Sequence, residues 1–94
     1  RRRRLAELRP YVKTAREMRG WKFDVHGPLL GSKTPWDCIF PARQLLANAR
    51  SVLDMGTGGA EGFSKILQGY TGLAVATEGW PPNVGVAREK LSSI

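Results

Sequence analysis

The segment VLDMGTGGAEGF, residues 52–63, constrains the fold of this chain more than any other. A short apolar run that ends in Asp54 is followed by four glycines and then by apolar residues at helical spacing, from Phe63 to Tyr70. Glycine lets the backbone turn sharply and approach a ligand without a Cβ in the way. The pattern predicts a strand over 51–55, a glycine-rich turn, and a helix over 60–70.

Similar elements are expected on both sides of this unit. Residues 41–49 favour a helix that begins at Pro41, with Leu45, Leu46 and Ala49 along one side. Residues 72–78 are expected to form a second strand, because residues 73–76 are a continuous apolar run, which is typical of a strand buried on both faces of a parallel sheet.

After residues 81–83, PPN, we expect a last helix that is capped by Asn83. The residues of this helix that should face inward are Val84, Ala87 and Leu91. The alternation of helices and strands predicts an α/β fold with a Rossmann-like parallel sheet, truncated after two strands. Residues 41–94 would be the N-terminal half of a cofactor-binding domain.

The net charge of +7 belongs to a leader, residues 1–22, which holds nine basic and two acidic residues. The remaining residues hold six of each and are neutral. The leader is predicted to be helical, with Pro10 in its first turn and Gly20 at its end; its apolar stripe is Leu8, Val12, Ala15 and Met18. A fraying, solvated end is the preferred interpretation of the first residues. A weak nucleic-acid contact through Arg1, Arg2, Arg3 and Arg4 is the alternative.

Residues 23–40 are expected to form an aromatic loop rich in glycine and proline. His26 and Cys38 each stand alone, so we predict no metal cluster and assign no catalytic residue. Asp24 and Asp37 flank the loop, but no pattern joins them to His26. A single cysteine fits a reducing compartment, so we expect a cytoplasmic protein, and the apolar runs are too short to cross a membrane.

Glu78 ends the second expected strand, twenty residues after Gly58. An acid at that position of a β–α–β unit can accept hydrogen bonds from both ribose hydroxyls of a nucleoside. The glycine turn and Glu78 would meet at the carboxyl edge of the sheet, where ligands of such sheets bind. Together they predict a ribose-bearing ligand.

A dinucleotide motif reads G-x-G-x-x-G, and here Glu61 occupies its last glycine position. Glu61 and Asp54 would both repel a pyrophosphate. A cationic ligand reverses this argument, because S-adenosylmethionine carries a sulfonium, an ammonium group and a ribose but no phosphate. The departures from the dinucleotide pattern therefore favour S-adenosylmethionine, with an NAD(P)-binding oxidoreductase fragment as the alternative.

The same residues resemble the first motif of class I S-adenosylmethionine-dependent methyltransferases, with Asp54, Gly56 and Gly58 matching and Ala60 in place of the final glycine. Residues 74–91, AVATEGWPPNVGVAREKL, are similar to the second-strand region of a poorly characterised bacterial methyltransferase group. That group also tends to have a tryptophan-rich entry and a Pro-Trp-Asp, like residues 21–24 and 35–37. The order WKFD departs from its usual Trp-Asp-Phe. The resemblance covers residues 20–91.

This resemblance implies a role for each motif residue. Asp54 would steer the methionine ammonium through water, and Glu78 would hold the ribose hydroxyls. Glu61 would either help at the methionine end or cap its own helix. The residues passing under the cofactor would be Gly56, Thr57, Gly58 and Gly59, and those near the adenine would be Gly79 and Trp80.

In this family, the residues that position the acceptor follow the fourth strand. We therefore expect half of a cofactor site and little of an acceptor site, with the methyl acceptor unassigned. A two-stranded unit leaves edges and helix faces uncovered, so we expect marginal stability and a need for a second copy or a missing half. The third interpretation is a non-enzymatic basic module that self-associates or binds RNA.

Overall fold

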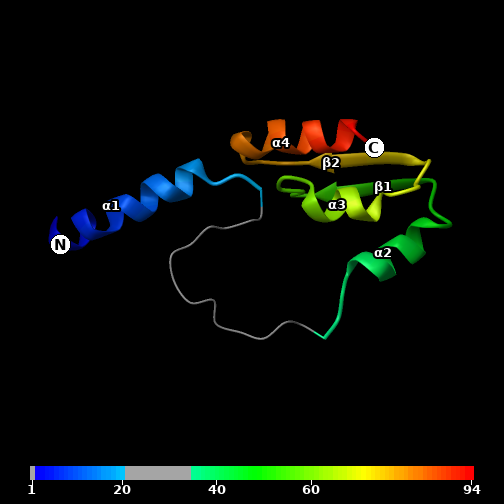
Figure 1. Ribbon diagram of the computed structural model, residues 1–94, viewed down its shortest axis with the longest axis horizontal. Helices are drawn as coiled ribbons and strands as arrows, with labels where there is room; N and C mark the ends of the chain where they lie inside the picture. Colours follow the sequence, from blue (N-terminus) through cyan, green and yellow to red (C-terminus); the bar gives the residue numbers. More distant parts are fainter. Residues whose placement is uncertain (1, 21–34) are drawn as a thin grey trace.

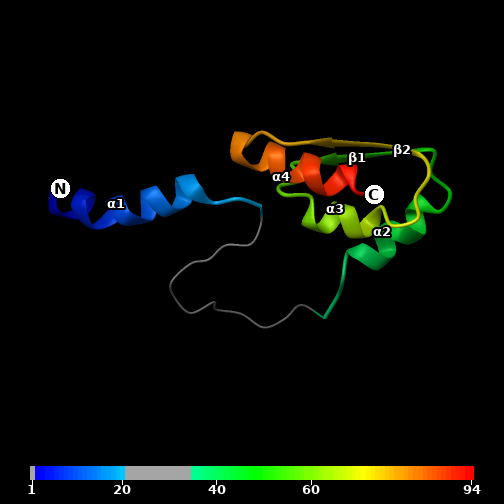
Figure 2. The same ribbon diagram turned by 45° about the horizontal axis from the view of Figure 1, so that its top comes forward.

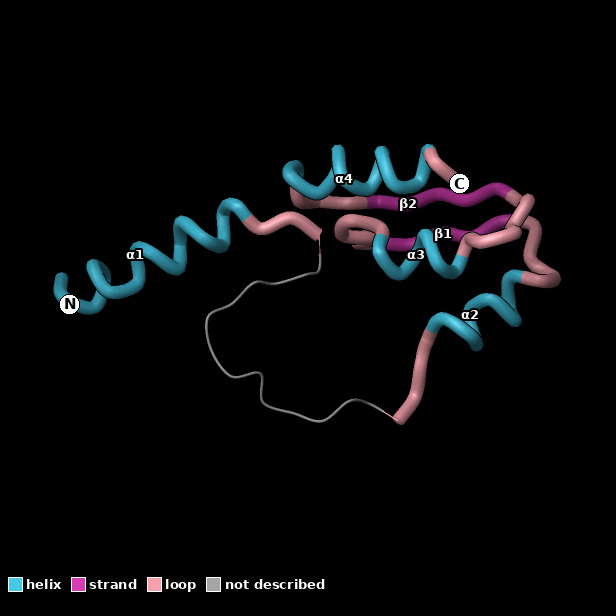
Figure 3. Tube along the Cα trace, viewed as in Figure 1, coloured by secondary structure: helices cyan, strands magenta, loops and turns pink. Residues whose placement is uncertain are grey.

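The computed structural model describes residues 2–20 and 35–94 (Figure 1). Within these ranges the chain forms four helices and two strands. In chain order they are α1 (Arg2–Glu17), α2 (Ile39–Leu46), β1 (Ser51–Met55), α3 (Glu61–Ile66), β2 (Leu73–Thr77) and α4 (Pro81–Ser92). Figure 3 shows the same order by type of secondary structure. The structure is thus mixed α/β, as predicted.

The two strands pair in parallel, with Leu53 opposite Val75 and Asp54 opposite Ala76. The predicted strand over 51–55 is confirmed, and β2 lies within the predicted 72–78. Because the strands are parallel, their carboxyl ends lie at one edge of the sheet, and α3 carries the chain back between them. Both α3 and α4 begin at that edge (Figure 1).

The core lies between the sheet and the helices. Leu46, Phe63 and Leu67 are its buried centre, and Val52 and Ala76 pack against them from the strands. In Figure 2, α2, α3 and most of α4 lie below the strands. The predicted stripe on α3 is confirmed: Phe63 and Leu67 are buried, and the neighbouring Ile66 and Tyr70 pack on the cluster.

The opposite face of the sheet is uncovered in the described part of the chain. Every second residue along the strands points away from the helices, and these residues are exposed: Leu53, Met55, Leu73 and Val75. The prediction that the second strand is buried on both faces is therefore wrong. Leu73 is 65% exposed, because no second layer of described residues packs on that side.

Several helix boundaries differ from the prediction. α2 begins at Ile39, two residues before Pro41, and Asp37 accepts a hydrogen bond from the Ile39 amide at 3.0 Å. The register of α2 leaves Leu45 exposed, so it does not share the buried side with Leu46. α3 ends at Ile66, and Gly69 adopts φ +77° in the turn that follows.

The two remaining corrections concern Pro10 and Asn83. Pro10 lies inside α1 rather than in its first turn, because the helix begins at Arg2. Lacking an N–H, Pro10 makes no helical hydrogen bond to the preceding turn. Asn83 does not cap α4, since the helix begins at Pro81 and Trp80 is its N-cap residue.

The helical leader is present as α1, but it packs differently from a core helix. None of its residues is buried, and Leu8 and Val12 of the predicted stripe remain about half exposed. Figures 1 and 2 both show α1 projecting away from the sheet. The segment after it, Met18–Gly20, forms hydrogen bonds to the start of α4.

Candidate functional site

The turn after β1 has an unusual backbone. Gly56, Gly58 and Ala60 adopt φ values of +76°, +63° and +61°, all in the left-handed region. Ala60 is the only described non-glycine residue there, and it occupies the place where the motif has its last glycine. Such a conformation is strained for a residue with a Cβ, whereas glycine adopts it freely. Sequence and backbone geometry therefore agree that this turn requires small residues.

The turn is tied to the end of β2. The amides of Gly56 and Thr57 both donate to the Thr77 carbonyl at 2.9 Å. Those two amides are consequently engaged within the protein. In the described ranges, the amides of Gly58 and Gly59 make no backbone hydrogen bond, and the Gly58 amide instead bonds to the Glu78 carboxylate.

Glu78 turns its carboxylate toward the glycine turn. Its Oε1 accepts a hydrogen bond from the Trp80 amide at 2.7 Å. This bond lowers the pKa of Glu78, partial desolvation opposes it, and the Gly58 amide, the Asn83 side chain and the Gly79 amide lower the pKa further. The carboxylate is thus held in its charged form beside Gly58. The structure brings together the two features that the sequence places twenty residues apart.

A cavity of about 350 Å³ opens at this edge, and the leader forms one of its walls. Ligand pockets span roughly 300–1,000 Å³, so this one is at the small end. From the carboxyl edge it is lined by Gly56, Glu78, Trp80 and Asn83, and from the leader by Ala15, Met18 and Gly20.

Three hydrogen bonds fix the leader at the start of α4. The Trp80 indole N–H donates to the Met18 carbonyl at 3.2 Å, and the Arg19 guanidinium donates to the Pro82 carbonyl at 3.2 Å. The Gly20 amide donates to Asn83 Oδ1 at 2.5 Å. Sequence reasoning missed these contacts, because they join positions more than sixty residues apart and follow no local pattern.

Glu61 lies on the leader side of the turn. Its carboxylate sits against Gly20 and Gly59, so that a Cβ on Gly59 would lie 2.7 Å from Glu61 Oε1. Glu61 is also the first residue of α3, where an acid is favourable. Both roles that the sequence predicts for Glu61 are compatible with this position. In addition, Glu61 packs against Gly20 of the leader.

Six of the nine expected site residues do not line the Glu78 cavity: Asp54, Thr57, Gly58, Gly59, Glu61 and Gly79. Asp54 lines a separate hollow together with Ala42 and Phe63, on the face that α2 and α3 cover. Thr57 is buried and lines a hollow beside α4 that Glu78 also borders, and its Oγ1 has no hydrogen-bond partner among the described residues. Gly79 is exposed.

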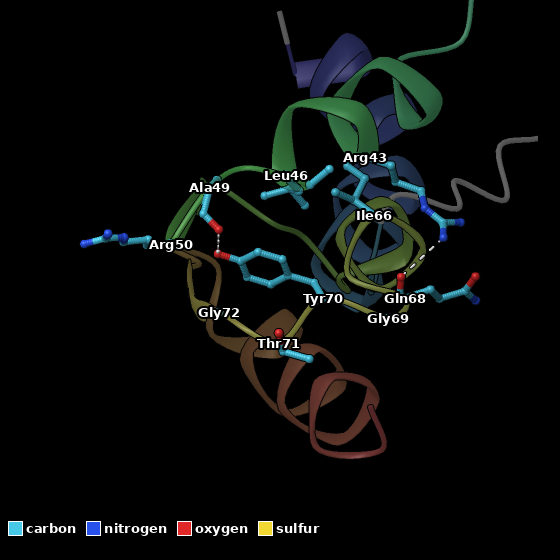
Figure 4. A pocket seen from close by; sticks show the side chains of 11 residues that line it. Arg43, Leu46, Ala49, Arg50, Ile66, Gln68, Gly69, Tyr70, Thr71 and Gly72 are labelled. Atoms are coloured by element: carbon cyan, nitrogen blue, oxygen red, sulfur yellow. Dashed lines mark hydrogen bonds between the residues drawn. The ribbon is translucent and has the colours of Figure 1, made fainter.

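A larger cavity, of about 450 Å³, lies at the amino edge of the sheet (Figure 4). Its polar groups are used within the protein: Arg43 Nη2 donates to the Gln68 carbonyl at 3.3 Å, and the Tyr70 hydroxyl donates to the Ala49 carbonyl at 3.2 Å. In Figure 4 the Arg50 side chain points away from the others. None of the candidate site residues named from the sequence lines this cavity.

Other kinds of site find little support in the described ranges. No group of three or more histidine, cysteine, aspartate or glutamate residues there could hold a metal ion. Over the same ranges, no helix has both the length and the apolar character needed to cross a bilayer. Cys38 is exposed, and Asp24 and His26 lie outside the described residues.

Comparisons with known proteins add no relative: no protein-family model, no curated protein and no solved structure matches this chain. The function must therefore be argued from the site itself.

Proposed function

We propose that this chain is the S-adenosylmethionine-binding part of a class I methyltransferase with a Rossmann-like sheet. One observation carries the proposal: the Glu78 carboxylate lies against the left-handed glycine turn, at the carboxyl edge of two parallel strands. Ligands of open parallel sheets bind at that edge. The resemblance of residues 52–63 and 74–91 to the family motifs agrees with it.

The residues at this edge fit a nucleoside with a free ribose. The Glu78 carboxylate accepts a hydrogen bond from the Trp80 amide on Oε1, and the Gly58 and Gly79 amides and the Asn83 side chain also stabilise its charge. The two ribose hydroxyls would bind to this charged carboxylate alongside these donors, or in place of some of them. The Trp80 ring is partly exposed beside it, with its N–H held by Met18, and would cover the adenine.

The methionine end is less well defined. The Gly59 amide, which makes no backbone hydrogen bond among the described residues, would face its carboxylate, as the family motif implies. Asp54 faces the α2 side, so this arrangement supports no direct contact between Asp54 and a ligand in the Glu78 cavity. Contact through water is what the resemblance implies.

S-adenosylmethionine supplies an activated methyl group when bound, and the protein supplies binding and orientation. The described residues provide Glu78 as an anchor for the ribose and Trp80 as a wall. We assign neither a catalytic base nor a methyl acceptor.

A dinucleotide is the competing ligand. Two of the turn amides already bond to Thr77, which leaves fewer donors for a pyrophosphate. Glu61 and Glu78 also place two carboxylates next to the turn, and both would repel the anionic pyrophosphate of a dinucleotide. The arrangement therefore favours the cationic cofactor.

The test is a calorimetric titration of the chain with S-adenosylmethionine, S-adenosylhomocysteine and NAD⁺. We expect heat with the first two and none with NAD⁺. Adenosine should bind more weakly, and 2′,3′-dideoxyadenosine should not bind, because it lacks both hydroxyls for Glu78. Binding of NAD⁺ in preference, or equal binding of adenosine and its dideoxy analogue, would refute the proposal.

A second candidate function, contact with nucleic acid, is favoured by α1. Four basic residues share one exposed side of this helix, at spacings of seven, four and three: Arg2, Arg9, Lys13 and Arg16. The only ion pair among the described residues is Arg3–Glu7, at 3.7 Å, and it leaves this stripe unneutralised. Arginine suits phosphate recognition through its planar set of donors.

We propose that this stripe, with Arg1–Arg4, contacts the phosphates of RNA. For single-stranded RNA, contacts from all seven basic residues predict a slope of log K against log salt of about −5. Replacing Arg9, Lys13 and Arg16 by glutamine should flatten the slope, whereas the control Arg88→Gln on α4 should not. If the triple variant leaves the slope unchanged, this surface of α1 is excluded as the contact for RNA.

A further inference from the structure

Asn83 is one of two buried polar residues in the described chain, the other being Thr57. Its Oδ1 accepts a hydrogen bond from the Gly20 amide of the leader at 2.5 Å. The carboxamide also lies beside the Glu78 carboxylate, and it is among the groups that lower the pKa of Glu78. Asn83, Glu78 and Gly20 also line one cavity.

The side chain does not serve its own helix. Asn83 is in the first turn of α4, where a polar side chain often caps the free amides, but no side-chain cap bond is made there. The Trp80 amide is instead satisfied by Glu78. The Asn83 carboxamide is therefore directed away from α4, toward two partners in other parts of the chain.

We propose that Asn83 is a positioning residue that couples docking of the leader to the orientation of Glu78. A buried carboxamide that loses either partner is left with an unpaired polar group, which is costly. Its bond to Gly20 and its position beside Glu78 consequently favour one common arrangement. When Gly20 is docked, the amide group faces Glu78 and holds its carboxylate toward the glycine turn.

Gly20 is suited to only one docked position. It is buried, with φ +68°, and any Cβ on it would collide with the Glu61 carboxylate. The leader end thus packs against Glu61 on one side and bonds to Asn83 on the other. Small displacements of the leader must therefore be transmitted to Asn83.

The consequence for ligand binding rests on the proposed function. If Glu78 holds a ribose, the ligand and the docked leader stabilise each other, and this coupling must be reciprocal. The leader would then control the affinity of the site through Asn83, in addition to forming one of its walls.

The first test needs no ligand and separates the two ends of the carboxamide. Asn83→Asp keeps an acceptor for the Gly20 amide but replaces the donor to Glu78 by a carboxylate oxygen. Asn83→Ala removes both. The two readouts are hydrogen exchange of the Gly20 amide and the ¹³C titration of the Glu78 carboxyl group, both by NMR.

We expect Asn83→Ala to accelerate Gly20 exchange by about tenfold, as for loss of one hydrogen bond, and to raise the pKa of Glu78. Asn83→Asp should raise the pKa of Glu78 while Gly20 stays protected. The matched controls are Asn48→Ala and Asn48→Asp, at an exposed position after α2, and should change neither readout. If Asn83→Ala unfolds the chain, the proposal is tested by Asn83→Asp alone. An unchanged Glu78 titration in Asn83→Asp would overturn the proposal.

The second test uses S-adenosylhomocysteine and a double-mutant cycle. Gly20→Ala displaces the leader and leaves Asn83 intact. If the two residues are coupled, the affinity losses of Gly20→Ala and Asn83→Ala will be far from additive, and additive losses would count against the coupling. Failure of the unmodified chain to bind would refute the proposed function, while the exchange and titration readouts still judge the coupling.

Discussion

The two edges of the sheet differ in how their polar groups are used. At the amino edge a cavity of about 450 Å³ is larger than the one that Glu78 shares with the leader, yet Arg43 and Tyr70 donate their hydrogen bonds to the carbonyls of Gln68 and Ala49. At the carboxyl edge the cavity between the sheet and the leader is about 350 Å³, and a charged carboxylate faces the Gly58 amide of the glycine turn.

This difference shows that cavity size alone does not identify a site. The bonds at the amino edge tie α2 and the turn after α3 together, so that edge stabilises the fold. At the carboxyl edge, three features require small or acidic residues. They are the left-handed turn, the carboxylate of Glu78, and the contact of Gly20 with Glu61. Changes at the two edges should therefore have separable effects on stability and on binding.

The largest effect is expected from a substitution in the core, because both edges of the sheet depend on it. Phe63 is 4% exposed and lies in the core beneath both edges. Phe63→Ala should reduce the free energy of unfolding by about 3–5 kcal/mol. Since a domain of this size has little stability to spare, we expect the variant to be largely unfolded by circular dichroism, with both edges lost. A cooperative melt close to that of the parent would show that the core is placed wrongly.

The next effect separates the edges by ligand affinity. Glu78→Gln removes the charge that would accept both ribose hydroxyls, and should weaken S-adenosylhomocysteine binding by about 100-fold. Arg43→Gln at the amino edge should leave the affinity unchanged. Calorimetry measures both, with Glu89→Gln on α4 as a second control. Equal losses for Glu78→Gln and Arg43→Gln would erase the distinction between the edges.

Two glycines of the same segment should respond in opposite directions. A Cβ on Gly59 would meet Glu61 Oε1 at 2.7 Å and the Gly20 Cα at 3.0 Å, whereas a Cβ on Gly62 would meet nothing within 4 Å. Gly59→Ala should therefore destabilise the chain by about 1–2 kcal/mol and displace the leader. Gly62→Ala, inside α3, should stabilise it by about 0.5–1 kcal/mol. Urea denaturation gives both values, and the same sign for both changes would be inconsistent with this packing.

A smaller effect is confined to the amino edge. Tyr70→Phe removes the hydroxyl that donates to the Ala49 carbonyl, and should cost about 1 kcal/mol of stability. The affinity for S-adenosylhomocysteine should stay the same under conditions where the variant is folded. A change in affinity without loss of stability would indicate that the ligand binds at the amino edge, which would contradict our account.

The smallest effect is the dependence of stability on pH through Glu78. Its pKa in the folded chain is lowered from the ordinary 4.5, chiefly by the Trp80 amide. The unfolded chain therefore binds its proton first as the pH falls, so the contribution is present above pH 4.5 and is lost as the pH drops through the folded pKa. The stability difference between the parent and Glu78→Gln should shrink below that pH in urea denaturation series. A difference that grows on acidification would reverse the sign we assign.

The local elements of this fold could be predicted from the sequence because they follow local patterns. The apolar run over 51–55, the glycines after it, and the stripe from Phe63 to Tyr70 each carry their own signal. The meeting of Glu78 with the turn was also predictable, since parallel strands bring their carboxyl ends to one edge.

The remaining features depend on contacts between distant parts of the chain. Nothing near Gly20 or Asn83 indicates that they bond across sixty-three positions. The exposure of Leu73 depends on the absence of a covering layer among the described residues, and an apolar run does not reveal this. The side of the sheet that Asp54 faces followed only from the packing of α2 and α3.

The central claim, that a sulfonium nucleoside binds at the carboxyl edge, is tested most directly by mapping amide chemical shifts. The isotope-labelled chain would be titrated with S-adenosylmethionine and followed by NMR. Our account predicts shifts at residues 56–59 and 78–80 and at Gly20, with none at Arg43, Tyr70 or Gly72. Shifts confined to the amino edge, or no shifts at saturating cofactor, would contradict it.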